Sequence, residues 1–532
     1  MTDHQDKQPA RHISAARVLR STEFLLVLAF FAILLVMGTL IYKDYGLHWD
    51  SIAQVDIGQR NYQYVFEHID TALRFKNRYY GPVFEVFLFA VTREMPQQQM
   101  YFARNLLNFL LFYCGVFFFY LLAKKTTGCW KMGLLGSIFL AASPRIFADS
   151  FYNSKDIPFL VVFIIAIYTL LRFLENPSWL NGAAHAVASG ILVALRMPGI
   201  VILFLTAVFL ALLIVTPPKS TSRARLVLAG LWYLALSTGL TFLFWPVLWQ
   251  NPPGELVNAF QFMSSFPWTG GSSLYRGTFV DPMALPWHYI PVWVLITTPL
   301  FLIATFLIGA VSGTTGLVHR PREILSTRSR YFLVSLAWLT LPVLAVILLK
   351  STLYDGWRQM YFIYPALLLI ALRGVQAVLS LRLSLIHPRL LRGVLILLIV
   401  VGLLEPLIFM VQAHPNEYAF FNILAGRDMQ AVKQKYELDY WGLSYRPGLE
   451  YILAHDPAET IPIYTATSPG RVNALLLTED QQQRLRYVSS PEVARYFLTT
   501  YRWHPQPYDY TDEVFSVKVG DASILSVFQL QP

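Results

Sequence analysis

Apolar runs long enough to cross a membrane recur along the chain from residue 24 to residue 411. A helix needs about 20 apolar residues to cross the roughly 30 Å of a bilayer's hydrocarbon core. The pattern predicts eleven spans, at 24–42, 100–122, 131–147, 157–174, 182–196, 198–216, 226–248, 289–311, 331–349, 360–381 and 391–411. The chain is therefore predicted to be a mainly α-helical, polytopic membrane protein.

Three of the apolar runs are too short for an ordinary crossing. Those at 182–196 and 198–216 meet at Arg196-Met-Pro-Gly199, and proline has no N–H with which to continue a helix. The pair could form a helical hairpin that stops short of the far surface. The run at 78–95 is charged at its ends and predicts a helix lying along the outer surface.

Basic residues in the loops set the predicted orientation, because positive loops stay in the cytoplasm. They fall on one side of the spans: Arg11, Arg17, Arg20, Lys124, Lys125, Lys131, Lys219, Arg223, Arg225, Arg320, Arg322, Arg328, Arg330, Arg382, Arg389 and Arg392. An odd number of spans then places the N-terminus inside. Outside lie the loops 43–99, 143–157, 250–288 and 350–359 and everything after residue 411. The first span has no evident small-residue cleavage site and is interpreted as a retained anchor.

The C-terminal part of the chain differs in composition from the rest. Short runs typical of strands, at 461–464, 514–519 and 524–528, are separated by turns and by a helix-like stretch at 491–498. These runs predict a small α/β domain on the outer face. The chain thus divides into a cytoplasmic tail (1–22), a transmembrane domain (23–411) and a periplasmic domain (412–532).

Composition excludes several classes of protein. Of the 532 residues, 55% are hydrophobic and only 14% are charged, and the mean hydropathy of +0.47 lies outside the soluble globular range. The net charge of +10 does not indicate nucleic-acid binding, because the basic residues cluster in short loops. Neither of the two cysteines lies outside and no N-glycosylation acceptor is present, which favours a bacterial inner membrane.

The first outer loop contains Asp50, the leading candidate for chemistry. Most acids in such a loop simply face water. Asp50, however, lies close to the end of the first span and is flanked by His48 and Trp49. Partial desolvation there would raise its basicity, and the carboxylate could take a proton from an acceptor hydroxyl or amine.

The second outer loop is rich in charged and polar side chains: Arg145, Asp149, Asn153, Lys155 and Asp156. Such groups beside a bilayer are costly unless they face a water-filled cavity or one another. A structural interpretation pairs Lys155 with Asp149 or Arg145 with Asp156. In a functional interpretation Lys155 binds a phosphate oxygen, and an acid binds a divalent cation or a sugar hydroxyl. The sequence leaves both open.

Two further cations lie on the outer side, where the charge rule does not predict them. Arg196 is at the tip of the predicted hairpin, and Arg358 ends the loop 350–358, which also contains Tyr354. Arg358 could bind a phosphate through two parallel hydrogen bonds, and Tyr354 could stack on a sugar. Acids, cations and aromatic rings together suit a lipid-linked phosphosugar.

Several segments carry a family resemblance when taken in order along this scaffold. They are Tyr45-Gly-Leu-His-Trp-Asp50, Tyr79-Tyr-Gly-Pro-Val83, Ser143-Pro144 through Asn153 to Asp156, Asp355-Gly-Trp-Arg358-Gln-Met-Tyr361, His414-Pro-Asn-Glu-Tyr-Ala-Phe-Phe-Asn422 and Leu438-Asp-Tyr-Trp-Gly-Leu-Ser-Tyr-Arg446. The chain resembles a bacterial glycosyltransferase of the GT-C superfamily. It is most similar to families 39 and 83, which include protein mannosyltransferases and aminoarabinose transferases.

The resemblance implies transfer of a sugar from a polyprenyl-phosphate donor to a lipid, glycan or protein acceptor at the outer face, with inversion at the anomeric carbon. Asp50 matches the acid of the first-loop signature and would be the general base. Asp156 matches the second-loop acid, and we expect Asn153 and Tyr354 to contact the donor. Lys155, Arg196 and Arg358 would neutralise the donor phosphate.

The cofactor requirement stays open in the sequence. Many members of these families have Asp-Glu where this chain has Asp50-Ser51, so a metal site that needs the second carboxylate lacks it. A divalent cation such as Mg²⁺ or Mn²⁺ is still an option. No nucleotide-binding motif of the Walker A or Gly-x-Gly-x-x-Gly type is present.

The alternative function is a transporter or flippase of a lipid-linked substrate. Transporters usually place ionisable residues near mid-membrane on broken helices and show internal repeats. Here the charges concentrate at one face and the halves differ, which favours the enzyme. A scaffold that presents the C-terminal domain would leave the acidic first loop unexplained.

Overall fold

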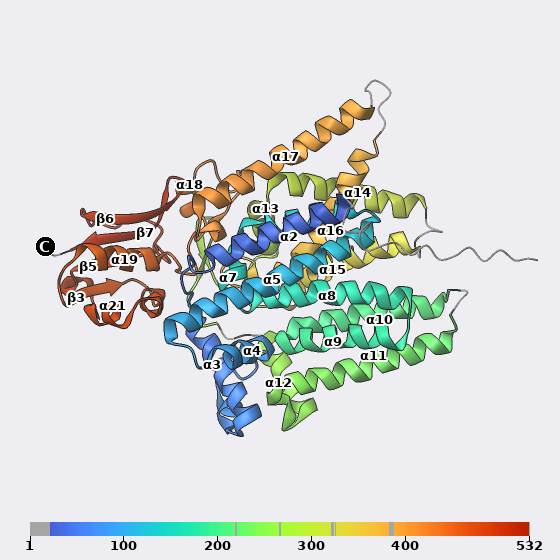
Figure 1. The fold of residues 1–532 in the computed structure, drawn as a ribbon, viewed down its shortest axis with the longest axis horizontal. Coiled ribbons are helices and arrows are strands. Elements are labelled where there is room, and N and C mark those ends of the chain that lie inside the picture. Colours follow the sequence, from blue (N-terminus) through green and yellow to red (C-terminus); the bar gives the residue numbers. More distant parts are fainter. Residues whose placement is uncertain are drawn as a thin grey trace, which may run out of the picture.

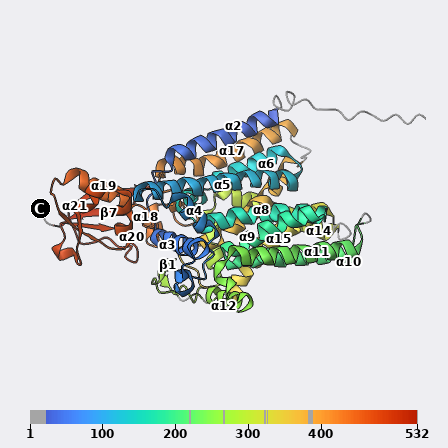
Figure 2. The same cartoon turned by 60° about the horizontal axis from the view of Figure 1, so that its bottom comes forward.

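The computed structural model describes residues 22–218, 221–264, 266, 268–320, 324, 326–381 and 388–530. Long helices lie side by side in a bundle, and a small sheet with its own helices sits at one end of it (Figures 1 and 2). In these ranges nine helices are long and apolar enough to cross a membrane, and a bent pair brings the number to ten. The predicted helical membrane fold with a small C-terminal α/β part is confirmed.

The predicted spans each correspond to a helix or a helix pair. The helices of spanning length are α2 (Thr22–Ile41), α5 (Gln97–Thr127), α8 (Asp156–Glu175), α11 (Arg223–Phe244), α14 (Leu300–His319), α15 (Thr327–Leu349) and α17 (Pro388–Ala413). Helices α10 (Ile200–Val215) and α16 (Tyr364–Leu379) reach this length together with the 3-10 turns that precede them, at Met197–Gly199 and Arg358–Ile363. Helix α9 (Trp179–Leu195) is apolar but has only 17 residues. It is joined to α10 by a 3-10 turn that follows Arg196, and Met197–Val215 is itself long and apolar enough to cross a membrane.

Two predicted spans are interrupted, and a proline accounts for each break. The span at 131–147 consists of α6 (Trp130–Ala141) and α7 (Pro144–Tyr152), which meet at an angle of 69°. Pro144 favours the first turn of a new helix, where its missing N–H costs nothing. The span at 289–311 is split into α13 (Tyr289–Thr297) and α14, because Pro299 drives Thr298 into an extended conformation.

The centre of the bundle is formed by α8 and α16, whereas α2 and α17 lie at its periphery. In α8 and α16, 72% of the apolar stretch is buried, compared with 11% in α17. Helices α14 and α16 cross closely at Gly309 and Gly374. A Cβ at Gly374 would lie 1.9 Å from the Thr305 carbonyl oxygen, so the crossing requires a residue without a side chain.

Shorter elements cover the end of the bundle next to the sheet. They are α3 (Ser51–Tyr62), α4 (Val83–Thr92), α12 (Pro252–Ser264), β1 (Ser273–Tyr275) and β2 (Thr278–Val280). Helix α4 is the helix predicted within 78–95, and its ten residues are too few to span a bilayer.

The C-terminal sheet has the strand order β4-β3-β5-β7-β6. Its elements are α18 (Met429–Lys433), α19 (Tyr445–His455), β3 (Ile461–Thr465), α20 (Pro469–Val472), α21 (Glu479–Arg484), β4 (Leu485–Tyr487), β5 (Tyr496–Thr499), β6 (Glu513–Val519) and β7 (Ala522–Gln529). Strand β5 pairs parallel to β3 and antiparallel to β7. The prediction of a helix at 491–498 is therefore wrong. Strand β5 is paired on both sides within the sheet, and this pairing overrides the local helical pattern.

The core of the sheet part is separate from the core of the bundle. Helix α19 packs Leu449 and Ile452 against Leu498 and Val527 of the sheet. The segment that follows α17 behaves differently, because Tyr418, Trp441 and their neighbours belong to the core of the bundle. This segment ties the sheet to the end of the bundle where the outer loops meet.

Candidate active site

Asp50 is held in a fixed turn directly before α3. Its backbone N–H donates to His48 Nδ1 at 3.1 Å, and the opposite ring nitrogen of His48 donates to the Tyr152 carbonyl at 3.0 Å. Burial lowers the pKa of His48 to about 3, and the nearby Lys155 and Arg358 add to this effect. His48 is therefore neutral at physiological pH and serves to position the turn.

The Asp50 carboxylate faces two cations. Lys155 Nζ lies 2.5 Å from its Oδ2 atom, and an Arg358 Nη atom lies 4.0 Å from the same oxygen. Burial raises the pKa of Asp50, but Lys155 and Arg358 outweigh it and hold the pKa well below its usual range. The expectation of raised basicity is wrong, because the sequence did not reveal how close these cations lie.

Asn153 links the two acids of the second loop. Its amide donates to Asp149 Oδ2 at 3.0 Å and to Asp156 Oδ2 at 2.9 Å, while its own oxygen accepts from the Asp156 backbone N–H at 2.9 Å. The bend between α6 and α7 buries this segment within the protein. Asn153 thereby fixes the first turn of α8 and the direction of the Asp156 carboxylate.

The two structural ion pairs considered for this loop do not form in the described residues. Lys155 binds Asp50, and Arg145 Nε donates to the Phe420 carbonyl at 2.9 Å. The Arg145 guanidinium also lies over the Phe421 ring at 4.5 Å. Lys155 is thus directed to the first loop, and Arg145 anchors the segment that follows α17.

Asp156 and Arg358 connect the remaining loops. Asp156 pairs with Arg196 at the α9–α10 reversal and, at 3.1 Å, with Arg358. Arg358 also pairs with Asp355 at 3.3 Å. Its guanidinium lies 4.9 Å from the centre of the Tyr354 ring. Asp50, Asn153, Lys155, Asp156, Arg196, Tyr354 and Arg358 thus form one continuous network, while their roles stay predictions.

Two side chains from the C-terminal part complete this network. The Trp441 ring lies 4.4 Å from the Arg358 guanidinium, and its N–H donates to Asp149 at 3.2 Å. Arg502 pairs with Asp355 at 2.8 Å. Trp441 lies in one of the family-like segments, but no sequence signal pointed to Arg502, which is 147 residues from its partner.

The backbone around the Asp355–Arg502 pair is strained. Asp355, Tyr501 and Trp503 have φ angles of 56°, 60° and 62°, in the left-handed region that residues with side chains rarely adopt. Such conformations persist only where surrounding contacts enforce them, and they cluster at functional sites. Here they bring the two charged groups together.

An apolar cavity of about 230 Å³ opens beside the network. Arg196, Tyr354 and Tyr80 bring polar groups to its lining. Apolar side chains of α10, α12 and α15 form its walls, among them Ile200, Val201, Phe260, Met263, Ala345, Val346 and Leu349. The arrangement can hold an anionic head group next to an apolar tail.

The carboxylates of the site are engaged by basic side chains. Asp50, Asp156 and Asp355 are each paired with an ammonium or guanidinium group. No group of three His, Cys, Asp or Glu side chains in the described part of the chain could hold a metal ion. The positive charges of the site come from Lys155 and the arginines.

Comparisons with known proteins found a family model that matches part of the chain. Residues 82–249 match the family model described as dolichyl-phosphate-mannose-protein mannosyltransferase. No curated protein sequence matches the chain.

Solved structures provide further similarities. ArnT from Cupriavidus metallidurans bound to undecaprenyl phosphate is 14% identical over 95% of this chain and 98% of its own, with a TM-score of 0.48. The oligosaccharyltransferase AglB from Archaeoglobus fulgidus is 11% identical over 89% of this chain and 70% of its own, with a TM-score of 0.44. Over residues 82–249 the protein is thus similar to the dolichyl-phosphate-mannose-protein mannosyltransferase family.

Proposed function

We propose that the protein transfers a sugar from a polyprenyl-phosphate donor to an acceptor at the outer face of the membrane, with inversion at the anomeric carbon. One observation carries the proposal: Arg196, which pairs with Asp156 in the ion-pair network, and Tyr354, which lies against Arg358, also line an apolar cavity. A long isoprenoid attached to a phosphate has the same division into an apolar and a charged part. The donor named in the matching family, dolichyl-phosphate-mannose, is of this kind.

The donor phosphate binds at Arg196, Lys155 and Arg358. Each of these cations already contacts a carboxylate, so it is held in place before the donor arrives. Guanidinium groups bind phosphate oxygens through paired, charge-assisted hydrogen bonds. Because they are preorganised, the cations stabilise the charge that grows on the phosphate as the sugar leaves.

Transfer is a single displacement at the anomeric carbon. The acceptor oxygen or nitrogen forms its bond to that carbon as the bond to the phosphate oxygen breaks, and the electron pair stays on the phosphate. Asp50 accepts the acceptor's proton. A carboxylate with a lowered pKa suffices, because the acceptor becomes strongly acidic once its bond to carbon has begun to form.

The network supplies the charge stabilisation that other transferases obtain from a metal ion. We infer that transfer is independent of divalent cations, since the three carboxylates of the network are engaged by basic side chains. Activity of the purified protein should be unchanged by EDTA. A loss of activity in EDTA that added Mg²⁺ or Mn²⁺ reverses would contradict this inference.

The binding step is tested with undecaprenyl phosphate, which lacks the sugar, and the purified full-length protein. Arg196→Gln and Lys155→Gln should each weaken binding about tenfold, the usual value of a charge-assisted phosphate contact. Arg427→Gln removes an exposed cation outside the network and should leave binding unchanged. Equal affinities in all four proteins would overturn the proposal. Analysis of the transferred sugar's anomeric configuration tests inversion separately.

A further inference from the structure

A second, larger cavity lies at the other end of the bundle, away from the sheet. It has a volume of about 1020 Å³ and lies between the α5–α6 connection, the first turns of α15 and α17 and the last turns of α16. In Figure 1 these ends lie on the side opposite the C-terminal sheet. The cavity shares no residue with the candidate active site.

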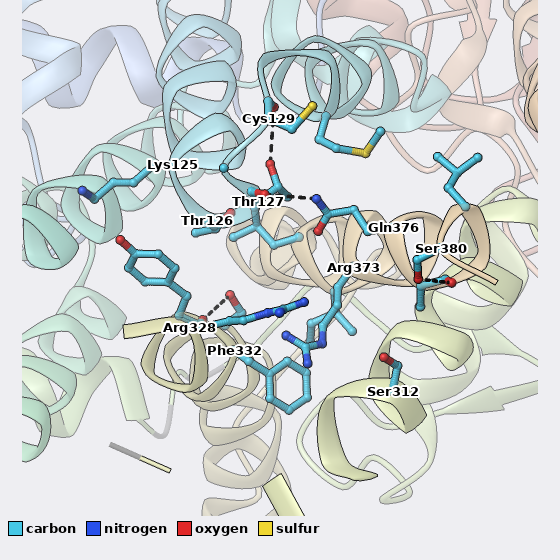
Figure 3. A pocket seen from close by; sticks show the side chains of 18 of the residues that line it. Lys125, Thr126, Thr127, Cys129, Ser312, Arg328, Phe332, Arg373, Gln376 and Ser380 are labelled. Atoms are coloured by element: carbon cyan, nitrogen blue, oxygen red, sulfur yellow. Dashed lines mark hydrogen bonds between the residues drawn. The ribbon is translucent and has the colours of Figure 1, made fainter. Parts of the chain in front are cut away.

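Three arginines from three helices line this cavity: Arg328 of α15, Arg373 of α16 and Arg392 of α17. Figure 3 shows the guanidinium groups of Arg328 and Arg373 turned toward one another. Throughout the described ranges no carboxylate forms an ion pair with these three side chains. Lys125 also lines the cavity, but Glu175 neutralises it.

The position of Arg373 is unlike that of a residue that only sets topology. Topology-determining cations lie in loops, where water solvates them. Arg373 lies six residues before the end of α16, about 9 Å along the helix. Its guanidinium stacks on the Phe332 ring at 5.0 Å, and its Nε atom is buried with no hydrogen-bond partner in the described chain. An ionisable group placed this deep usually marks a binding site.

The rest of the lining suits the head group of a lipid. Ser312 and Thr327 bring hydroxyl groups to the cavity, while Phe332 and Ile396 bring apolar surface. Ile396 belongs to the peripheral helix α17 and is 55% exposed, so the cavity adjoins the surface that faces lipid. A ligand here can place an anionic group between the arginines and its apolar chains along α17.

We propose that this cavity binds the head group of a phosphate-bearing anionic lipid from the cytoplasmic leaflet. Basic pockets between transmembrane helices on the cytoplasmic side are suited to such head groups. Phosphate oxygens would accept hydrogen bonds from Arg328 and Arg373 and relieve the repulsion between them. The proposal does not depend on the reaction at the other face.

Native mass spectrometry of the full-length protein with added phosphatidylglycerol or phosphatidylcholine tests the proposal. The wild type should retain phosphatidylglycerol preferentially. The double variant Arg328→Gln/Arg373→Gln should bind it about tenfold more weakly. Arg225→Gln loses the same kind of charge from an exposed position outside the cavity and should bind like the wild type.

Two controls test whether the variants fold and whether the bound phosphate belongs to a lipid. Arg328 is exposed, so the single variant Arg328→Gln keeps the test valid if the double variant does not fold. It should also bind phosphatidylglycerol more weakly than Arg225→Gln does. Equal retention by Arg328→Gln and the wild type overturns the proposal. Displacement of the lipid by millimolar inorganic phosphate alone also overturns it, because a soluble anion would then be the ligand.

Discussion

Asp50 illustrates how neighbouring charges define a residue's chemistry. Lys155 and Arg358 outweigh the effect of burial and keep the pKa of Asp50 well below its usual range. The carboxylate therefore stays ionised across the physiological pH range and is ready to accept a proton. The same two cations contact the donor phosphate in the proposed reaction, so base and leaving group share their counter-charges.

Replacing Asp50 by asparagine should remove proton acceptance and leave the fold intact. We expect Asp50→Asn to lower the transfer rate about 100-fold or more, the usual contribution of a general base. The matched control is Asp56→Asn, because Asp56 lies in α3 and, in the described part of the chain, forms its ion pair with Arg60, outside the network. An assay of purified proteins should show near-normal transfer for this control. Substantial activity in Asp50→Asn would contradict the base assignment.

The ion pairs of His414 predict that the stability of the folded protein depends on pH. His414 bridges Asp44 of the first loop at 3.0 Å and Glu417 at 2.7 Å. Burial lowers the pKa of His414, but Glu417 and Asp44 outweigh it and raise the pKa to about 9. The protonated form is therefore favoured by folding. Its stabilisation is complete below the ordinary histidine value near 6.5 and is lost as the pH rises through about 9.

Thermal unfolding in detergent between pH 6 and pH 10 measures this effect. The unfolding midpoint of the wild type should fall above about pH 7. His414→Gln cannot gain or lose a proton at this position, so its midpoint should be lower at pH 6 and should vary less with pH. Parallel curves for the two proteins would show that the bridge does not contribute.

Some site residues could be found from the sequence and others could not. Lys155, Arg196 and Arg358 were identifiable because cations on the outer side break the charge rule. Arg502 has no such signal, because it lies among aromatic residues in the C-terminal part and meets Asp355 only after folding. The lowered pKa of Asp50 depends on distances that the sequence does not contain.

At the level of elements, hydropathy located each span but not its shape. The pattern of apolar residues is nearly the same for a straight helix and for a broken one, so it does not reveal the bend between α6 and α7 at Pro144. That bend brings Asp149 and Asn153 into the protein. Similarly, the residues of β5 lie in a stretch whose local pattern is helical. They form a strand because they pair with β3 and β7, and the local sequence does not show these partners.

The close crossing of α14 and α16 predicts that the stability of the fold depends strongly on Gly374. In Gly374→Ala the new Cβ would lie 1.9 Å from the Thr305 carbonyl oxygen, so the helices must separate. We expect a loss of about 1–3 kcal/mol in the free energy of unfolding, as for other overpacked sites. Gly239→Ala in α11 is the control, since its Cβ meets nothing within 4 Å. Its unfolding midpoint in detergent should be unchanged or higher.

At the level of the whole molecule, the two charged cavities lie at opposite ends of the bundle. We propose that the sheet end faces the periplasm of a bacterial inner membrane and that the N-terminus and the arginine-lined cavity face the cytoplasm. The placement rests on the distribution of basic loop residues. It puts the network of Asp50 at the surface where a lipid-linked sugar would meet its acceptor.

Labelling with a membrane-impermeant maleimide tests this orientation. In a background with Cys114→Ala and Cys129→Ala, which removes both native thiols, Glu459→Cys places a thiol in an exposed loop of the sheet part. Arg225→Cys places one at the exposed start of α11. In intact spheroplasts only Glu459→Cys should react, and Arg225→Cys should react after permeabilisation. The reverse result would invert the topology.

In the proposed reaction, the electrostatic balance of the ion-pair network changes during each catalytic cycle. Among the ion-paired groups alone, four cations (Lys155, Arg196, Arg358 and Arg502) face the three carboxylates of Asp50, Asp156 and Asp355, an excess of one positive charge. A donor phosphodiester carries one negative charge and neutralises it. After transfer the lipid phosphate carries two, balanced only while Asp50 keeps the acceptor's proton. Loss of that proton to bulk water then makes the assembly net negative, so deprotonation would help to expel the spent lipid carrier.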